Sequence, residues 1–352
     1  MSFSSYSVAK KATRKNTFLN QINAIIDWSP IEKAINKIYK KGYSVSGRPS
    51  YPGLLLFKMQ LLQTWYNMSD VEVEDFVNEN ISAMYFCGLS LEDAVPDHST
   101  LSRFRKELTR RKAYDKLLQI LNRQLEEKKI KISQGSKMVD ASITETPYRP
   151  KGKPVYEVAC DRKEDERSVE TIKQEASSMR LVRKQQPGVD YQARWLRKGK
   201  QLYFGYKRHY LTDSEGLVDS VHTTPANRHD SKGLKPLLAK IKENQITDLF
   251  ADKGYQVPDN NRLLKSLHIK NRIQHKAYRN RPLTHYEKIF NYLIGKTRYV
   301  IERTFGGIKL WFGGGYARYK GVAKVHAQHV IEAIAYNLKR APGLVMQKGI
   351  VW

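Results

Sequence analysis

The stretch QLYFGYKRHYLTDSEGLVDSVHTTPA, residues 201–226, decides the fold class of this 352-residue chain. It predicts two adjacent β-strands, because runs rich in Tyr, Leu, Val and Thr flank an Asp-Ser-Glu-Gly turn. An earlier run, SKMVDASITE (136–145), predicts another strand by its alternation of β-forming residues. A later run, ITDLFADKGY (246–255), predicts a short apolar strand that ends in an aspartate.

Helices are predicted after this hairpin, at 230–243 and 259–268, and they alternate with the strand at 246–255 and a short strand, IKNRI. Three strands followed by alternating helices and strands indicate an antiparallel start and a parallel continuation. The sequence therefore predicts an α/β fold with a mixed sheet over residues 130–345. A charged segment at about 149–200 shows no clear strand period, and we expect an insertion or a long loop there.

Residues 25–128 have helical periodicity and predict an all-helical, helix-turn-helix-like domain. In its basic helix DHSTLSRFRKELTRRK (97–112), Leu101, Phe104 and Leu108 form an apolar stripe. The opposite face carries candidates for contact with a phosphate backbone or a DNA groove: Arg103, Arg105, Lys106, Arg110 and Arg111. An ordinary solvated helix face explains the same pattern. The basic, Ser-rich residues 1–24 are expected to form a flexible arm.

The net charge narrows the choice of partner. The chain has 62 Lys and Arg against 35 Asp and Glu, a formal charge of +27. Such an excess favours a polyanion, with nucleic acid first and an anionic membrane second. The membrane is disfavoured because the sequence offers no basic amphipathic helix with a Trp or Phe face. It also contains no long apolar run and no secretory signal, so we expect a cytoplasmic protein.

Three carboxylates are candidates for chemistry. Asp140 interrupts an apolar strand, where strand position alone gives no reason for an acid. Asp252 stands at the carboxyl end of its strand, the edge at which open α/β sheets place their ligands. Glu302 lies on a later helix, within RYVIERTFGGIK (298–309). Hard oxygen ligands from separate elements suit a pair of Mg²⁺ ions, which can activate a nucleophile and stabilise a leaving oxygen in phosphoryl transfer.

Basic residues surround the third acid on its helix. Arg298 lies one turn before Glu302, and Lys309, seven residues after it, returns to the same helix face. Taken singly, each acid has a simpler explanation. An aspartate near a strand end is commonly a turn or cap residue, and Arg298 with Glu302 fits a plain i, i+4 ion pair.

Four motifs connect these residues to a known family. MVDASITETP, YFGYKRHYLTDSEGLVDSVHTTPANRHDS, LFADKGY and RYVIERTFGGIK, in this order, closely resemble the DDE transposases of bacterial insertion sequences, in particular the insertion-sequence-five family. The N-terminal part, from IDW through GRPSYPGLLLFKMQLL to PDHSTLSRFRKEL, resembles the helical domain that precedes the catalytic domain in that family. The resemblance covers about residues 25–340.

The resemblance implies a ribonuclease-H-like catalytic domain that uses two Mg²⁺ ions, for which Mn²⁺ can substitute. By motif match Asp140, Asp252 and Glu302 look like its three acids. The related signature Y-x2-R-x3-E-x6-K is met at Arg298, Glu302 and Lys309. Its tyrosine is missing because position 295 is Gly. Any role tied to that tyrosine is therefore left open.

Two further residues are candidates for contact with DNA. Trp195 can stack on an unpaired base, although packing against the sheet explains it as well. Arg303 follows Glu302 in the cationic part of the chain.

The resemblance implies a transposase that binds the terminal inverted repeats of its element, then cleaves strands and transfers them to target DNA. The implied partners are the double-stranded DNA of the transposon ends and of the target. Pairing of ends favours a homodimer or a higher oligomer, working in the bacterial cytoplasm and associated with the nucleoid when bound to DNA. Two other functions stay open: a non-catalytic DNA-binding regulator or inactivated transposase descendant, and a structure-selective nuclease of the same fold.

Overall fold

The computed structural model describes most of the chain: residues 14–39, 50–152, 156–159, 180–183, 186–241 and 245–350.

Seven helices of the described residues form the N-terminal part. They are α2 (Arg14–Ile25), α3 (Ser29–Asn36), α4 (Gly53–Trp65), α5 (Asp70–Glu79), α6 (Ile81–Cys87), α7 (His98–Arg110) and α8 (Ala113–Glu127). α4 is buried almost all round, so the other helices pack about it. α7 buries the predicted stripe of Leu101, Phe104 and Leu108. The predicted helical character of this part is confirmed.

The expected arm at residues 1–24 is wrong for its second half. Residues 14–24 belong to α2, and residues 1–13 lie outside the described part of the chain. Leu19, Ile22 and Ile25 are fully or almost fully buried in the helical core. Their helical spacing was present in the sequence, but the basic and serine residues around them concealed it.

The second part is built on a six-stranded mixed sheet. Its strands are β1 (Gly135–Glu145), β4 (Arg194–Lys198), β5 (Gln201–Thr212), β6 (Val218–Pro225), β7 (Ile246–Ala251) and β8 (Lys270–Ile273). β1 pairs antiparallel with β5, and β5 pairs antiparallel with β6. On its other edge β1 pairs parallel with β7, which pairs parallel with β8. The order β6–β5–β1–β7–β8 is the ribonuclease-H-like arrangement, and the predicted mixed sheet is confirmed.

The charged segment at about 149–200 contains more strand than its sequence indicated. Its described residues include β2 (Tyr156–Ala159) and β3 (Arg180–Arg183), which pair only with each other. They also include β4, which pairs antiparallel with the first half of β5 and so extends the main sheet.

Helices cover both faces of the sheet. The face that carries Val139 and Leu211 packs against α10 (Leu234–Leu238) and α11 (Pro258–Ser266). The other face carries Tyr210, whose ring stacks on Phe305 of α12 (His285–Phe312) at a centroid distance of 5.2 Å. Neighbouring side chains alternate between the two faces of a strand, so Asp140, paired with Tyr210, lies on the α12 face.

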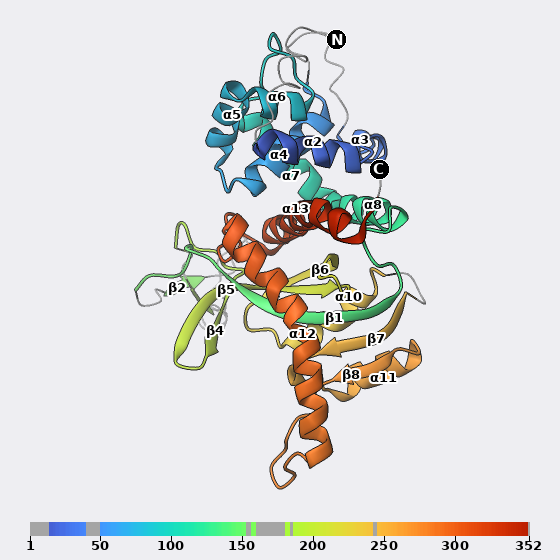
Figure 1. Ribbon diagram of the computed structural model, residues 1–352. Helices are drawn as coiled ribbons and strands as arrows, with labels where there is room; N and C mark the ends of the chain where they lie inside the picture. The colour runs from blue at the N-terminus through green and yellow to red at the C-terminus, as the bar shows by residue number, and fades with distance from the viewer. Residues whose placement is uncertain are drawn as a thin grey trace, which may run out of the picture.

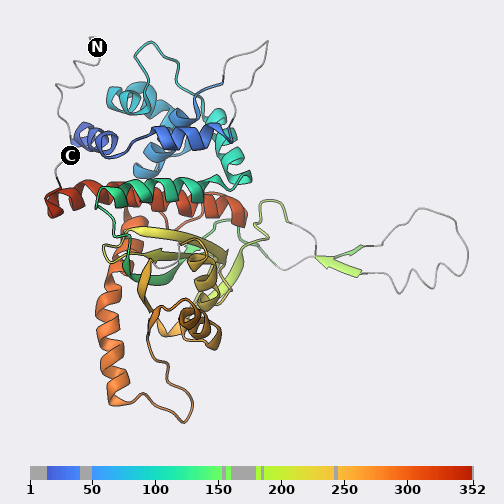
Figure 2. The ribbon, with the colours of Figure 1, turned by 90° about the vertical axis from the view of Figure 1, so that its right-hand side faces the viewer.

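The long C-terminal helix α13 (Val322–Lys348) lies between the sheet and the N-terminal helices, as both views show (Figures 1 and 2). One hydrophobic core runs through it and includes Leu118 of α8, Val221 of β6 and Ala333 of α13. A buried ion pair, 2.6 Å between Arg208 of β5 and Glu332, adds a polar connection. Because the two parts share this core, the domain boundaries at 25–128 and 130–345 stay predictions.

Among the helices of the described ranges, none combines the length and the apolar character that a membrane span needs.

Candidate active site

The first two acids meet at one edge of the sheet. In the parallel pairing of β1 and β7, Val139 lies opposite Ala251. The residues that follow these partners are Asp140 and Asp252, so both carboxylates lie at the same level of the sheet. The sheet thereby joins two acids that are far apart in the sequence, at the carboxyl end of β7 where such folds bind their ligands.

Arg298 of α12 bridges the two aspartates. Its Nη2 donates to Asp140 Oδ2 at 2.8 Å, and its Nη1 lies 3.8 Å from Asp252 Oδ1. The arginine is 10% exposed, while Asp252 is 41% exposed. Arg298 Nε is buried and has no hydrogen-bond partner in the structure. The site therefore holds one fixed cation between two acids, with Asp252 open to solvent.

Burial dominates the acidity of Asp140. It raises the pKa of this carboxyl, and the charge of Asp252 raises it further. The Arg298 guanidinium and a hydrogen bond from the Ala141 backbone N–H act in the opposite direction without cancelling the rise. The ionised pair of aspartates is thus electrostatically costly, and additional positive charge at the site would stabilise it.

Glu302 lies one helical turn beyond Arg298 and is exposed. In the part of the chain that the structure describes, no group of three or more His, Cys, Asp or Glu side chains is placed to hold a metal ion. The structure therefore brings Asp140 and Asp252 together and leaves Glu302 on the neighbouring helix surface.

The two aspartates fit a divalent cation by their chemistry. They are hard oxygen ligands, as Mg²⁺ and Mn²⁺ accept, and Asp252 is accessible. Burial and the neighbouring charge of Asp252 raise the pKa of Asp140, so a cation bound at the pair would stabilise its ionised form. Residues that could hold such an ion are Asp140 and Asp252, with Glu302 as a candidate third ligand.

Lys309 is placed beside this site rather than in it. It lines a groove of about 440 Å³ together with the β1 residues that directly follow Asp140, and with Lys198 and Tyr203. Partial burial lowers the Lys309 pKa, with Arg208 and Lys198 adding to the effect. The two lysines outnumber the one acid that lines this groove, Glu145, so the groove suits a phosphate backbone.

Tyr255 is a member of the site that the sequence did not single out. It is 1% exposed, and its hydroxyl has no hydrogen-bond partner in the structure. Burial raises its pKa well above the ordinary value, and the charges of Asp140 and Asp230 raise it further. A neutral donor is thus held close to the acids. Its place in LFADKGY, three residues after Asp252, was the only sequence signal.

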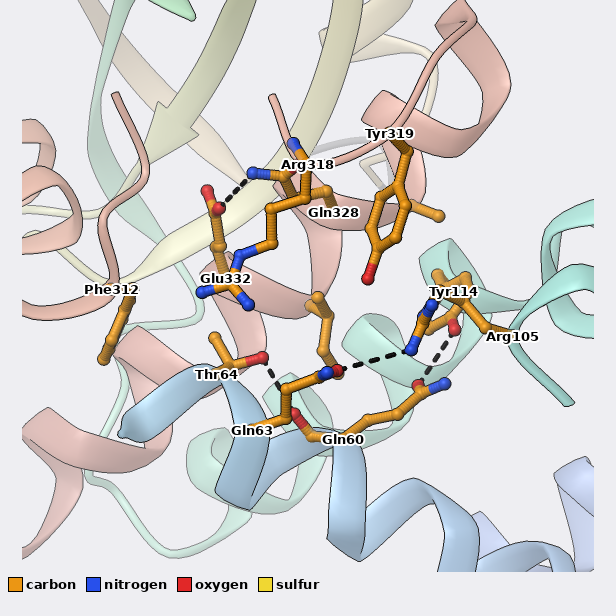
Figure 3. Close-up of a pocket in the computed structure, with 12 residues that line it drawn as sticks. Gln60, Gln63, Thr64, Arg105, Tyr114, Phe312, Arg318, Tyr319, Gln328 and Glu332 are labelled. Carbon is orange, nitrogen blue, oxygen red and sulfur yellow. Dashed lines mark hydrogen bonds between the residues drawn. The ribbon is translucent and has the colours of Figure 1, made fainter. Parts of the chain in front are cut away.

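Arg105 is not presented to DNA as predicted. Figure 3 shows it turned into a small polar cavity of about 30 Å³ lined by residues of α4, α7 and α13. There its guanidinium donates to Asp70 and to Gln63, and the arginine side chain is 12% exposed. Burial raises the Asp70 pKa, but the hydrogen bond and charge of Arg105 outweigh it and hold the pKa below its ordinary value. Arg105 is therefore a structural cation of the helical core.

The other predicted DNA-binding residues of α7 face solvent. Arg110 and Arg111 are 60% and 56% exposed, and both pair with Glu107. Arg103 donates to Ser99, and Lys106 is exposed. Their charges are available to a polyanion, although Glu107 already neutralises part of them.

Trp195 and Arg303 also lie on the surface. Trp195 is 44% exposed, and its ring packs on Phe204 with centroids 5.0 Å apart, so it combines sheet packing with an open edge. Arg303 is exposed, donates to the Glu215 carbonyl at 2.9 Å and lies over the ring of Tyr299.

Comparisons with known proteins identify the family of the chain. A family model described as a transposase domain (DUF772) matches residues 7–107, and one described as a transposase DDE domain matches residues 139–338. The transposase for insertion sequence element IS1106 of Neisseria meningitidis serogroup B is 37% identical over 240 residues, which is 68% of this chain and 76% of that protein.

Solved structures give only remote likenesses. The Mos1 mariner paired end complex with Mn is 12% identical, and the match covers 89% of this chain and 83% of that chain with a TM-score of 0.20. A pre-cleavage Mos1 transpososome is 10% identical, with coverage of 97% and 100% and a TM-score of 0.20. These TM-scores are too low to support a conclusion. On the two family models and the Neisseria relative, the chain belongs to the DDE transposases of bacterial insertion sequences, enzymes that act on DNA.

Proposed function

We propose that this DNA transposase binds the terminal inverted repeats of its own insertion sequence, then cleaves and transfers strands with Mg²⁺ held by Asp140, Asp252 and Glu302. The observation that carries the proposal is the meeting of Asp140 and Asp252 on neighbouring parallel strands, bridged by Arg298. Asp252 stays 41% exposed, so the pair is accessible to a ligand from solvent. Burial and the charge of Asp252 raise the pKa of Asp140, and a bound cation would stabilise its ionised form.

Mg²⁺ bound by Asp140, Asp252 and Glu302 would supply Lewis-acid activation of an attacking water or 3′-hydroxyl and stabilisation of the leaving oxygen. The protein's part is to fix the ligands. Asp140 is oriented by the Ala141 N–H and by Arg298, while the exposed Asp252 is free to adjust. Glu302 completes the ligand set from α12.

Arg298 has two tasks in this proposal. Before metal binds, it offsets part of the negative charge of the two aspartates and holds them together. Once positive charge is supplied at the acids, its guanidinium and its unpartnered Nε–H become available to a phosphate oxygen. Lys309 holds the DNA backbone in the adjoining groove.

Recognition of the ends is assigned to the helical part and the outer basic residues. Arg103, Lys106, Arg110 and Arg111 on α7 offer exposed cations, and Trp195 offers an open aromatic edge. Because two ends must be joined, the working complex is a homodimer or a higher oligomer on DNA. Short inverted repeats in the DNA that flanks the gene would supply the substrate.

The test is a cleavage and joining assay on a duplex that carries the inverted repeat, with Mg²⁺. Wild type is expected to nick the end and to join it to a target plasmid. Asp140→Asn, Asp252→Asn and Glu302→Gln are each expected to lose at least about 10³-fold in cleavage while they still bind the duplex. Undiminished cleavage by any variant removes that residue from the site. Cleavage without joining of pre-cut ends would favour a nuclease instead.

A further inference from the structure

Two adjacent glycines in the interior of α12 have different surroundings. A Cβ at Gly307 would lie 2.9 Å from the Tyr336 ring, so the packing of α12 on α13 requires a glycine there. A Cβ at Gly306 would meet nothing within 4 Å. Glycine destabilises a helix interior relative to alanine, and among the described residues no contact explains the choice at Gly306. A molecule that approaches the helix from outside would explain it.

Gly306 is beside the proposed third ligand. It follows Glu302 by four residues, and Tyr299 precedes Glu302 by three, so all three share one helix face. All three are exposed. A molecule bound along this face at Glu302 would contact the exposed Tyr299 one turn before it and the backbone of Gly306 one turn after it. The missing side chain leaves room for a bulky backbone at this point.

Two pairs of tyrosine and cation extend this face. Lys296 Nζ lies 4.5 Å from the ring centroid of Tyr292, and Arg303 Cζ lies 5.8 Å from that of Tyr299. The tyrosines are 62% and 57% exposed. The second pair repeats the first after seven residues, a displacement of about 10 Å along the helix axis. In an exposed pair of this kind, the cation can bind a phosphate and the ring can pack on a sugar or a base.

The N-terminal half of α12 projects beyond the sheet, as both views show (Figures 1 and 2). The segment before α12 and the first half of the helix, residues 276 to 297, carry five Lys and Arg, namely Lys276, Arg279, Arg281, Lys288 and Lys296. The one acid there, Glu287, caps the helix and pairs with Arg281. Two identical tips would repel each other, whereas a polyanion complements them.

We propose that duplex DNA lies along the outer face of α12, defined by Tyr292, Lys296, Tyr299, Arg303 and Gly306, with its backbone closest to the protein at Gly306. This inference rests on the proposed function, because it places the DNA beside Glu302. The surface would guide the DNA strand to Asp140, Asp252 and Glu302. Close approach of the DNA backbone would also explain why position 306 is a glycine.

The experiment compares Gly306→Ala and Gly306→Gln with Gly343→Ala. Gly343 is a matched control, an exposed glycine inside α13 whose Cβ would also meet nothing within 4 Å. Both alanine variants are expected to raise Tm by about 2 °C. Binding of the inverted-repeat duplex, measured by anisotropy in EDTA, is expected to weaken about tenfold for Gly306→Ala and further for Gly306→Gln. Gly343→Ala is expected to bind as wild type does.

Wild-type affinity in Gly306→Gln would overturn the inference. A second result would also overturn it. If Tyr292→Ala changed self-association in sedimentation without DNA but kept its affinity for the duplex, the outer face of α12 would bind a second copy of the chain instead of DNA. Failure of the proposed function has a different signature, namely undiminished cleavage by Glu302→Gln. The two failures are therefore separable.

Discussion

Two helices of this transposase, α7 and α12, carry several basic side chains, and they differ in what already neutralises those charges. On α7, Arg105 is buried against Asp70, and Arg110 with Arg111 shares Glu107. On α12, Lys296 and Arg303 lie over tyrosine rings that carry no charge.

A count of basic residues is therefore a poor guide to where a polyanion gains most from binding. Both helices have an apolar stripe with cations on other faces, and the sequence of α7 is the more basic of the two. An internal carboxylate reduces the gain from releasing counterions, because that cation was already partly neutral. What distinguishes the helices is therefore the partner of each cation in the free protein.

The largest effect on DNA cleavage is expected at Arg298, the α12 cation that contacts Asp140 and Asp252. Arg298→Ala removes the charge that bridges Asp140 and Asp252, so the Asp140 pKa should rise further. Cleavage of the inverted-repeat duplex is expected to fall about 10²–10³-fold. Arg298→Lys keeps the charge without the two-pronged reach and should recover only part of the rate. A wild-type rate of cleavage in Arg298→Ala would show that Arg298 does not contribute to catalysis.

Arg105 on α7 is expected to act on stability instead. Arg105→Ala leaves Asp70 partly buried without its cation, and the free energy of unfolding should fall by about 3 kcal/mol in urea titrations. Arg103→Ala, on the same helix but exposed, is the matched control and should change it by less than about 0.5 kcal/mol. Equal stability of the two variants would contradict the structural role of Arg105.

Salt dependence compares the two helices directly. The logarithm of DNA affinity falls with the logarithm of salt by about 0.9 per phosphate contact. The double variant of Lys296→Ala and Arg303→Ala is expected to reduce that slope by about 1.8, twice the value for one contact. Arg110→Ala with Arg111→Ala should reduce it less, because Glu107 already pairs with both. Equal reductions would show that internal pairing does not matter.

A smaller effect concerns Asp140 and pH. Its pKa is raised in the folded state from an ordinary value of 3.8. The folded protein therefore holds this proton to higher pH, and the unfolding free energy falls as the pH rises through that interval and is flat above it. Asp140→Asn should remove this loss, so the variant is expected to have the higher unfolding free energy at pH 7. Unfolding curves for both proteins at pH 3.5 and pH 7 measure it. A less stable variant at pH 7 would mean that the pair with Arg298 outweighs burial.

Much of the fold could be predicted because its patterns are local. The β-rich runs at 136–145 and 201–226 became β1, β5 and β6, and the stripe of α7 was buried as expected. α2 was missed because basic residues surround its apolar stripe. β4 was missed because an edge strand with a mostly exposed surface has no apolar alternation to detect.

The candidate site was harder to predict because it depends on pairing over long distances. The strand order places Asp140 beside Asp252, but the sequence does not contain the register of Val139 with Ala251. Arg105 and Asp70 are on different helices, so nothing local showed that this arginine turns inward. The catalytic role of Glu302 stays a prediction from the motif.

The most direct test is calorimetry of Mg²⁺ with the transposase bound to its inverted-repeat duplex. Wild type is compared with Asp140→Asn, Asp252→Asn and Glu302→Gln, and with Glu107→Gln as a control acid on α7. The account predicts carboxylate-dependent binding that is lost or at least about tenfold weaker in the three site variants and unchanged in the control. The same Mg²⁺ affinity in all five proteins would contradict it.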